Sequence, residues 1–358
     1  MDFEWTEHEQ KLRDGIAAAL SEIGEAGTDR DALLAASQRL AGAGYWDVVL
    51  GPAGDGEALA LAAANLEIAR HSASLFAALH FSRILAGLVE ALGDAALRER
   101  ILGPLRAGEA LGAVAISQPL DAREVEDGAL ALDGRAPYVA NGPLADWLAV
   151  RAATGEGDER LCLVAPDDAG VTLEPRQALL GLDGLHTCAV RFEAVAVPAG
   201  RALRIADDGV LRWQRRAHDL GLAVAGAGLM QRALEAAKAH AGEHERGGRA
   251  IRKYQAVGFK LAEMLTLAQT AELLCFRAAW IISGSDAEAD VVAACAKVFC
   301  SENAERVASD AIQVLAGAGV AAGTTVEQAF RDAKTLAVLG TSNEIARVNI
   351  ADQLLEKY

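Results

Sequence analysis

The spacing of apolar residues changes twice along the chain, and this change limits the fold more than any other feature. Over residues 6–108, alanine and leucine recur at three- and four-residue intervals, as in amphipathic helices, with short glycine or proline breaks. Between residues 111 and 198 the apolar runs shorten and turn residues separate them, as in strands. The helical spacing then returns. The sequence predicts an α+β, mostly α fold: an amino-terminal helical domain (1–110), a central small β domain (111–207) and a carboxy-terminal four-helix bundle (208–358).

Several local elements are specific enough to be tested. We expect four to six helices before residue 108. Residues 147–154 and 160–166 are predicted to pair as strands around a turn at 155–158, and 190–198 to form a further strand. The dipeptide Asp133-Gly134 predicts a tight turn.

The charge balance narrows the choice of partners. The chain has 34 Lys and Arg against 50 Asp and Glu, a net charge of -16, and no extended basic cluster. Such a surface repels phosphate backbones, so we expect no nucleic acid and no membrane as a partner, and instead small molecules or proteins. The cysteines are odd in number, at five, and lack C-x-x-C spacing, which favours reduced core residues and a cytoplasmic location.

Two motifs resemble known ligand sites. The string from His240 to His244 has the H-x-x-E-H form of some zinc peptidases, but Gly242 weakens a helix there and arginines crowd the region, so no metal is predicted. The glycines from Gly317 to Gly323 resemble a dinucleotide turn. Because the preceding run has helical rather than strand spacing, an inter-helix loop is the better interpretation.

Several longer strings, in a fixed order, resemble one family. The chain is similar to the flavin-dependent acyl-CoA dehydrogenases in the stretches Ile116-Ser-Gln-Pro119, Tyr138-Val-Ala-Asn141, Gln255-Ala-Val-Gly-Phe-Lys-Leu-Ala-Glu-Met264, Phe330-Arg-Asp-Ala-Lys334 and Gly340-Thr-Ser-Asn-Glu344. This resemblance implies a helical, β, helical subunit and FAD held between the β domain and the bundle. It also implies a dimer or tetramer in which a neighbouring subunit completes the cofactor site.

The chemistry implied by the resemblance is α,β-desaturation of an acyl thioester, either an acyl-CoA or an acyl carrier. A base removes the α-hydrogen, and the β-hydrogen leaves as hydride to the flavin. An electron-transfer flavoprotein or oxygen would then take the electrons. Partners are therefore the acyl thioester, a second copy of the chain or a related dehydrogenase subunit, and the electron acceptor.

The resemblance also implies which residues contact FAD. The positions that match are Ser117, Tyr138, Ala140, Arg246, Gln313, Gly317, Ser342 and Glu344. At Ala140 the family has a threonine, so a hydroxyl donor is missing, whereas Ser117 keeps one. Arg246 matches the family's arginine only after a shift of two residues. We therefore expect FAD to be weakly held or shared with a partner subunit.

The family's usual base is a glutamate just before G-T-S, and this chain lacks it. An ungapped count places Gly340 at that position, and a one-residue slide places Leu339 there. Some relatives carry the base on the first helix of the bundle, where the match brings His218, with Asp219 next to it. His218 is the candidate base, because an imidazole is able to accept a proton near neutral pH.

Three interpretations remain open at this stage. The chain is an active flavoprotein with a displaced base, or a catalytically silent subunit that completes a partner's site, or a non-flavin binding protein on the same fold.

Overall fold

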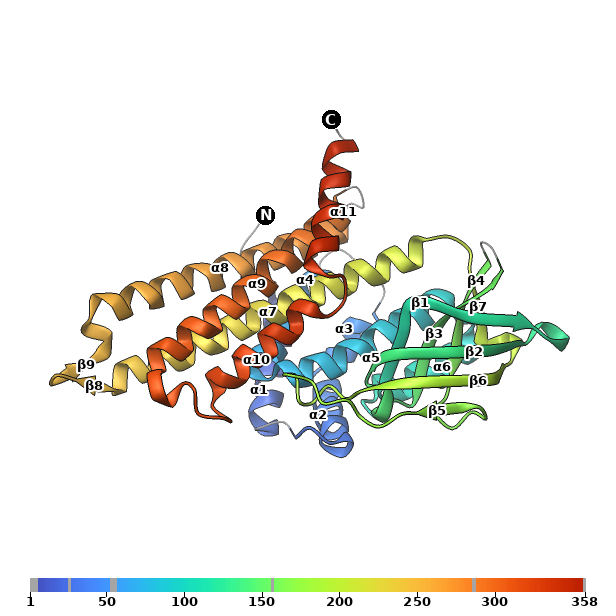
Figure 1. Ribbon diagram of the computed structural model, residues 1–358, viewed down its shortest axis with the longest axis horizontal. Helices are drawn as coiled ribbons and strands as arrows, with labels where there is room; N and C mark the ends of the chain where they lie inside the picture. Colours follow the sequence, from blue (N-terminus) through green and yellow to red (C-terminus); the bar gives the residue numbers. More distant parts are fainter. Residues whose placement is uncertain (1–5, 25–26, 52–56, 156–157, 285–287, 357–358) are drawn as a thin grey trace.

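The structure, a computed structural model, describes residues 6–24, 27–51, 57–155, 158–284 and 288–356. Helices at both ends of the chain flank a single seven-stranded sheet, which lies at one end of an elongated helical body (Figure 1). This arrangement confirms the fold class predicted from the sequence. Part of the turn predicted at 155–158 lies outside the described residues.

Six helices are described before residue 110, at the upper limit of the prediction. They are α1 (Glu7–Ile23), α2 (Arg30–Gly42), α3 (Tyr45–Val49), α4 (Glu57–His71), α5 (Ala73–Leu92) and α6 (Ala95–Arg106). Their starts follow from capping chemistry. Thr6 and Glu9 form a reciprocal capping box on α1, and Asp29 accepts a hydrogen bond from the Ala32 amide at the start of α2.

Helix α5 is the core helix of the molecule. Nearly all of its side chains are buried between the sheet and the carboxy-terminal helices. Two of the described helices, α5 and α8 (Gln255–Gly284), are long and apolar enough to cross a bilayer, but the apolar window of α5 is 78% buried inside the protein. Its composition is therefore explained by its place in the core.

The sheet has the strand order β5-β6-β2-β1-β3-β4-β7. Only the β1–β3 pair is parallel among the described strand pairs of this sheet. The predicted pair of strands around residue 156 is confirmed as β3 and β4, and the predicted strand before Pro198 as β6. The strands are β1 (Gly112–Glu124), β2 (Leu130–Ala140), β3 (Trp147–Gly155), β4 (Asp158–Val164), β5 (Val171–Leu173), β6 (Thr187–Val197) and β7 (Ala202–Ile205).

The tight turn predicted at Asp133-Gly134 is wrong. Strand β2 continues through both residues, and its register against β6 shifts between Leu132 and Gly134, as at a β-bulge. Gly134 has a φ of +136°, which a glycine adopts without strain, and Asp133 Oδ1 accepts a hydrogen bond of 2.7 Å from the Ala194 amide on β6. The dipeptide lies opposite a bulge in β6, where Glu193 and Ala194 together face Asp133.

Polar groups join α5 to the sheet. Asn141, which follows β2 with a φ of +61°, donates its side-chain amide to the Ala78 carbonyl of α5 at 2.7 Å and to the Gly112 carbonyl of β1 at 3.0 Å. The Gly112 amide donates in turn to Ser82 Oγ on α5 at 2.9 Å. These buried bonds fix the start of β1 and the end of β2 against the helix.

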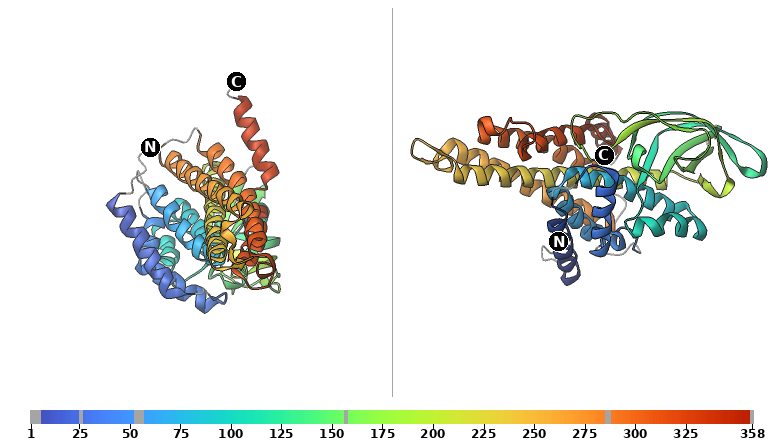
Figure 2. Two further views of the ribbon diagram at one scale, coloured as in Figure 1. Left: turned by 90° about the vertical axis from the view of Figure 1, so that its left-hand side faces the viewer. Right: turned by 90° about the horizontal axis from the view of Figure 1, so that it is seen from below.

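The carboxy-terminal bundle is built around α7 (Gly209–Glu243), which packs on α4, α5, α8, α9 and α10. The other helices are α8, α9 (Ala289–Leu315), α10 (Thr325–Val338) and α11 (Asn343–Glu356), with the short hairpin β8–β9 (Glu245–Arg246 and Arg249–Ala250) after α7. Figure 2 (right) shows α7, in yellow, running along most of the helical body when the molecule is seen from below. Short 3-10 turns lie at Glu126–Gly128, Gly142–Leu144, Ala199–Arg201, Ile251–Lys253 and Ala316–Ala318.

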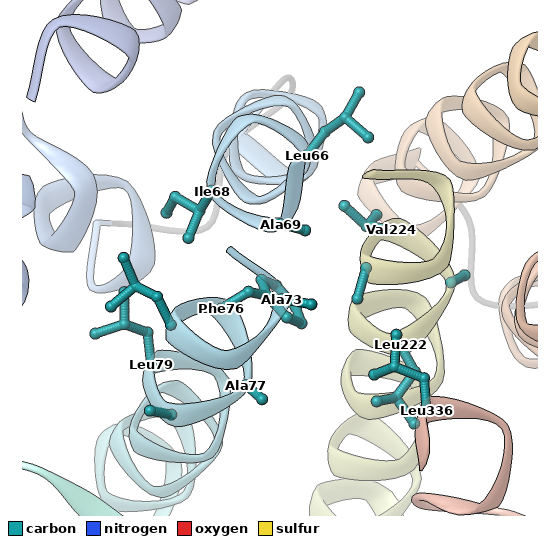
Figure 3. Close-up of a cluster of buried hydrophobic side chains, with 14 of the residues drawn as sticks. Leu66, Ile68, Ala69, Ala73, Phe76, Ala77, Leu79, Leu222, Val224 and Leu336 are labelled. Atoms are coloured by element: carbon teal, nitrogen blue, oxygen red, sulfur yellow. The ribbon is translucent and has the colours of Figure 1, made fainter. Parts of the chain in front are cut away.

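The core between the two helical regions is apolar and tightly packed. In Figure 3, Ala69 of α4 faces Val224 of α7, and Leu222 of α7 lies beside Leu336 of α10. Gly228 lets α7 approach α4 closely, because a Cβ there would lie 2.7 Å from the Arg70 backbone nitrogen. Burial of these side chains supplies the main driving force for joining the helical regions.

One outward face remains apolar. On α8, Phe259, Leu265, Leu273 and Trp280 are exposed, Phe259 to 70%. Helix α11 projects from the body in Figure 1, with Val348 and Leu355 also exposed. Exposed apolar side chains gathered on one helix are typical of surfaces that contact another chain.

Candidate active site

The two alternative positions for a base meet at one point in the structure. Gly340 lies in the short loop between α10 and α11 with a φ of +68°. A Cβ added to Gly340 would lie 2.5 Å from Cδ2 and 2.8 Å from Nε2 of His218 on α7. The imidazole therefore occupies the space into which a side chain at position 340 would extend.

The His218 ring is held from α5 by a second histidine. His80 Nε2 lies 2.7 Å from His218 Nδ1, and Phe81 packs against the His218 ring with centroids 5.3 Å apart. His80 itself fits against α7 only because position 221 is glycine, where a Cβ would lie 2.3 Å from the His80 ring. His80 was not predicted as a site residue from the sequence, although a histidine in so apolar a helix indicates one.

Arg83, one helical turn after His80, is a buried cation beside both histidines. Its Nη2 donates to the Ala217 carbonyl at 2.8 Å and lies 3.3 Å from His80 Nδ1. Burial, reinforced by the charge of Arg83, lowers the pKa of His80 well below its ordinary value. Burial also lowers the pKa of His218 to about 3, with Arg83 and Lys297 acting in the same direction. Both imidazoles are therefore neutral at physiological pH.

The loop that carries Gly340 is anchored by Lys297 on α9. This fully buried ammonium group donates to the Ala337 carbonyl at 3.1 Å and to Asn343 Oδ1 at 2.6 Å. Asn343 also donates to Ser301 Oγ at 3.1 Å. These bonds hold both ends of the loop, so the position of Gly340 relative to His218 is fixed by α9.

Asp219 lies at the edge of a separate small cavity. The cavity measures about 180 Å³ and is lined by Arg212, Arg215, Arg216, Asp290 and residues of α11. Asp219 is buried, and its Oδ1 has no hydrogen-bond partner. Burial raises the pKa of Asp219 to about 6, although nearby Lys297 and a hydrogen bond from Thr341 lower it.

Asp219→Asn should therefore change the pH dependence of stability. A folded-state pKa above the unfolded value means that the native state favours the protonated acid. Its stabilising contribution is complete below about pH 4 and is lost as the pH rises through 6. Because asparagine stays neutral, the variant should match the wild type near pH 4. At pH 7.5 it should be more stable by as much as about 3 kcal/mol.

Urea denaturation at the two pH values measures this difference. Asp208→Asn, which removes an exposed carboxylate one residue before α7, controls for the loss of one negative charge. An advantage of Asp219→Asn that is as large at pH 4 as at pH 7.5 would contradict the prediction.

Comparison with known proteins identifies the chain's relatives. The family model described as acyl-CoA dehydrogenase, C-terminal domain, matches residues 203–355. A probable acyl-CoA dehydrogenase of Bacillus subtilis is 30% identical over 71% of this chain and 71% of its own length. The chain belongs to the acyl-CoA dehydrogenase family.

Further relatives match most or all of the chain. The benzylmalonyl-CoA dehydrogenase of Aromatoleum aromaticum is 28% identical, over 99% of this chain and all of its own. Among solved structures, butyryl-CoA dehydrogenase of Megasphaera elsdenii superposes with a TM-score of 0.91 at 25% identity, covering 99% of this chain and 100% of the other. A 3-(aryl)acrylate reductase of Clostridium sporogenes, 28% identical over 72% of each chain, shows that relatives are named for more than one redox reaction.

The family positions matched to FAD contacts fall into two groups. Ser117, Tyr138 and Ala140 lie on β1 and β2, at the sheet end of the molecule. Ser342 and Glu344 lie in the loop before α11 and in the first turn of that helix. Ser117 and Tyr138 are exposed, Tyr138 to 76%, so both are accessible to a ligand.

Arg246, Gln313 and Gly317 form the second group, at the far end of the bundle. Arg246 is in the β8–β9 hairpin after the last residue of α7, whose 35 residues span about 50 Å. Gln313 and Gly317 close α9 and start the turn that follows it. The structure does not bring this group together with the sheet group within one subunit.

The structure describes both motifs that were set aside in the sequence. Gly317 and Gly319 form the turn between helices α9 and α10, as predicted, so the strand expected before a dinucleotide turn is replaced by a helix. The rings of His240 and His244 stack with centroids 4.9 Å apart. Within the described part of the chain, no three histidine, cysteine or acidic side chains gather as metal ligands would.

Proposed function

We propose that this chain is a subunit of an FAD-dependent oxidoreductase that desaturates acyl thioesters between the α- and β-carbons. The observation that carries the proposal is the meeting of His218 and Gly340. These are the two positions at which members of the family carry their base. In this chain the His218 ring fills the space that a side chain at position 340 would otherwise occupy. Burying a polar ring is costly, and a hydrogen-bond contact with His80 compensates for this cost at His218.

The residues present fit FAD. Ser117 and Ser342 offer hydroxyl donors for the flavin, and the exposed guanidinium of Arg246 suits a pyrophosphate. Arg246 follows the carboxy-terminal end of α7, a helix about 50 Å long, whereas Ser117 lies on β1, so Arg246 would serve the cofactor of a neighbouring subunit. The cofactor supplies an acceptor for the β-hydride.

The protein's own part of the reaction is to bind, orient and exclude water. His218 is the group proposed to face the α-carbon, and its side chain is almost wholly buried, which keeps water from the reacting carbons. The anchored loop at Gly340 leaves backbone, rather than a side chain, beside the ring.

The apolar outer face of α8 supports assembly with another subunit. Phe259 and Trp280 are both more than half exposed on that helix. A second copy of the chain or a related dehydrogenase subunit would cover this face. An electron-transfer flavoprotein remains the proposed electron acceptor.

A second function is favoured by one specific observation. Position 340 has no side chain, and two cations oppose protonation of His218. A subunit built this way could complete a partner's site while the partner supplies the base. The chain would then be the silent member of a heteromeric dehydrogenase.

Absorbance of the purified protein distinguishes these functions. For the active subunit we expect a yellow protein whose flavin bleaches anaerobically when acyl thioesters are added, and His218→Ala should slow bleaching about 100-fold or more. His8→Ala, an exposed histidine on α1, is the matched control. Colourless protein that gains FAD only when co-expressed with a related subunit supports the silent role. Protein that never binds FAD refutes both.

A further inference from the structure

Arg83, His80 and His218 form one buried chain of polar groups that runs from α5 to α7. Arg83 Nη2 lies 3.3 Å from His80 Nδ1, and His80 Nε2 lies 2.7 Å from His218 Nδ1. All three side chains are less than a tenth exposed. Each contact has to be a donor facing an acceptor, because buried polar groups that face each other without a shared proton are unfavourable.

The direction of each hydrogen bond in this chain of polar groups follows from Arg83. A guanidinium group has only donors, so His80 Nδ1 must accept. A neutral imidazole that accepts at Nδ1 carries its proton on Nε2, and His80 therefore donates to His218 Nδ1. We propose that Arg83 and His80 are positioning residues that fix His218 as the neutral tautomer with its proton on Nε2, so that the ring presents a hydrogen-bond donor beside Gly340.

The groups around His218 disfavour its other tautomer and its charged form. If His218 carried its proton on Nδ1, His80 would have to accept at Nε2 and would turn its own Nδ1–H toward the Arg83 donor. If His218 were an imidazolium, it would face two cations, Arg83 on α5 and Lys297 on α9. The loop packed on its other side, residues 339–343, contributes no ionisable side chain. Burial adds to the penalty on the charged form.

The tight fit of the rings also maintains the arrangement. A Cβ at Gly221 would lie 2.3 Å from the His80 ring, and a Cβ at Gly340 would lie 2.8 Å from His218 Nε2. Both rings therefore fill spaces that only glycine leaves open. The edge of His218 that meets Gly340 is the edge that carries Nε2.

This tautomer gives His218 a defined role, which rests on the proposed function. An Nε2–H group beside a bound acyl thioester donates to an electron-rich atom such as the carbonyl oxygen and stabilises negative charge that develops there. It does not accept an α-proton at the same nitrogen. The α-proton would then be accepted by a carboxylate that His218 does not supply. This agrees with the second function, in which a partner subunit supplies the base.

Nitrogen NMR of histidine-labelled protein tests the tautomer directly. Spectra of His218→Gln and His80→Gln assign the two rings among the seven histidines. In the wild type we expect His218 to show a protonated Nε2 and an unprotonated Nδ1 as a single form between pH 5 and 8. A wild-type His218 with its proton on Nδ1, or charged near neutral pH, would overturn the proposal.

Paired variants test the two positioning residues. His80→Gln keeps an amide donor for His218 Nδ1 and should keep the Nε2–H form, whereas His80→Leu should release a mixture of both tautomers. Arg83→Lys keeps a cationic donor, whereas Arg83→Met should move the pKa of His218 toward its ordinary value of about 6.5. An unchanged tautomer in His80→Leu refutes the role of His80.

Where a variant does not fold, the wild-type spectrum alone decides the tautomer. These spectra require neither flavin nor thioester. A protein that fails to bleach flavin would therefore count against the proposed function and leave this inference intact. Conversely, the Nδ1–H form in a protein that bleaches flavin would refute the inference alone.

Discussion

A glutamate at position 340, with the His218 ring removed, is expected to accelerate the reduction of bound flavin by an acyl thioester. Relative to the matched glutamine variant, the acceleration should be about 100- to 10,000-fold, the usual contribution of a positioned base. The double variant is His218→Ala with Gly340→Glu. The ring must go because its Cδ2 lies only 2.5 Å from the site of the new Cβ. Its removal leaves space into which the carboxylate can extend.

The matched control is His218→Ala with Gly340→Gln. Glutamine has nearly the same shape and bears the same backbone strain at a φ of +68°, but it cannot accept the proton. Stopped-flow bleaching of the two FAD-loaded variants isolates the carboxylate. Equal rates would show that position 340 does not face the reacting carbon in this chain.

Gly228→Ala is expected to destabilise the protein by about 1 kcal/mol, although alanine is the better helix former. The new Cβ would lie 2.7 Å from the Arg70 backbone nitrogen and 2.8 Å from the Ala69 Cβ. Backbone atoms of α4 cannot rotate aside, so the two helices must separate, at a cost of about 1–3 kcal/mol. This outweighs the gain in helix propensity of about 1 kcal/mol.

Gly242→Ala on the same helix is the control. The nearest atom to its new Cβ is the Arg252 guanidinium at 3.8 Å, an ordinary contact with a flexible side chain. This variant should therefore gain up to about 1 kcal/mol. Urea denaturation midpoints compare the two. Stabilisation of both variants would mean that α7 and α4 do not pack as closely as described.

Periodicity was sufficient to predict the fold class because most elements bury one face. The paired strands around residue 156 and the strand before Pro198 are short apolar runs bounded by turn residues, and both are confirmed. Asp133-Gly134 was misread because the same small residues suit a turn and a strand position opposite a bulge. Whether they end a strand or bend it depends on the partner strand, in this case on the bond from the Ala194 amide to Asp133.

The site was predictable only in part, for a different physical reason. Matching along the chain gave Gly340 and His218 as rival positions, and three-dimensional packing makes them neighbours. His80 contacts His218 across 138 residues of sequence, and local spacing carries no information about such a contact. Whether Arg246 and Ser117 act on one cofactor stays a prediction, since they belong to opposite ends of a subunit.

Helix α5 contacts both the sheet and the carboxy-terminal bundle, although the sequence predicts a domain boundary at residue 110. One of its sides bonds to the sheet through Ala78 and Ser82, and its other side carries His80 and Arg83 against α7. Loss of this helix would expose the core of both neighbours at once. We therefore expect the predicted boundaries at 110 and 207 to be changes of architecture inside one cooperative folding unit, so that a fragment that starts at residue 111 should not fold alone.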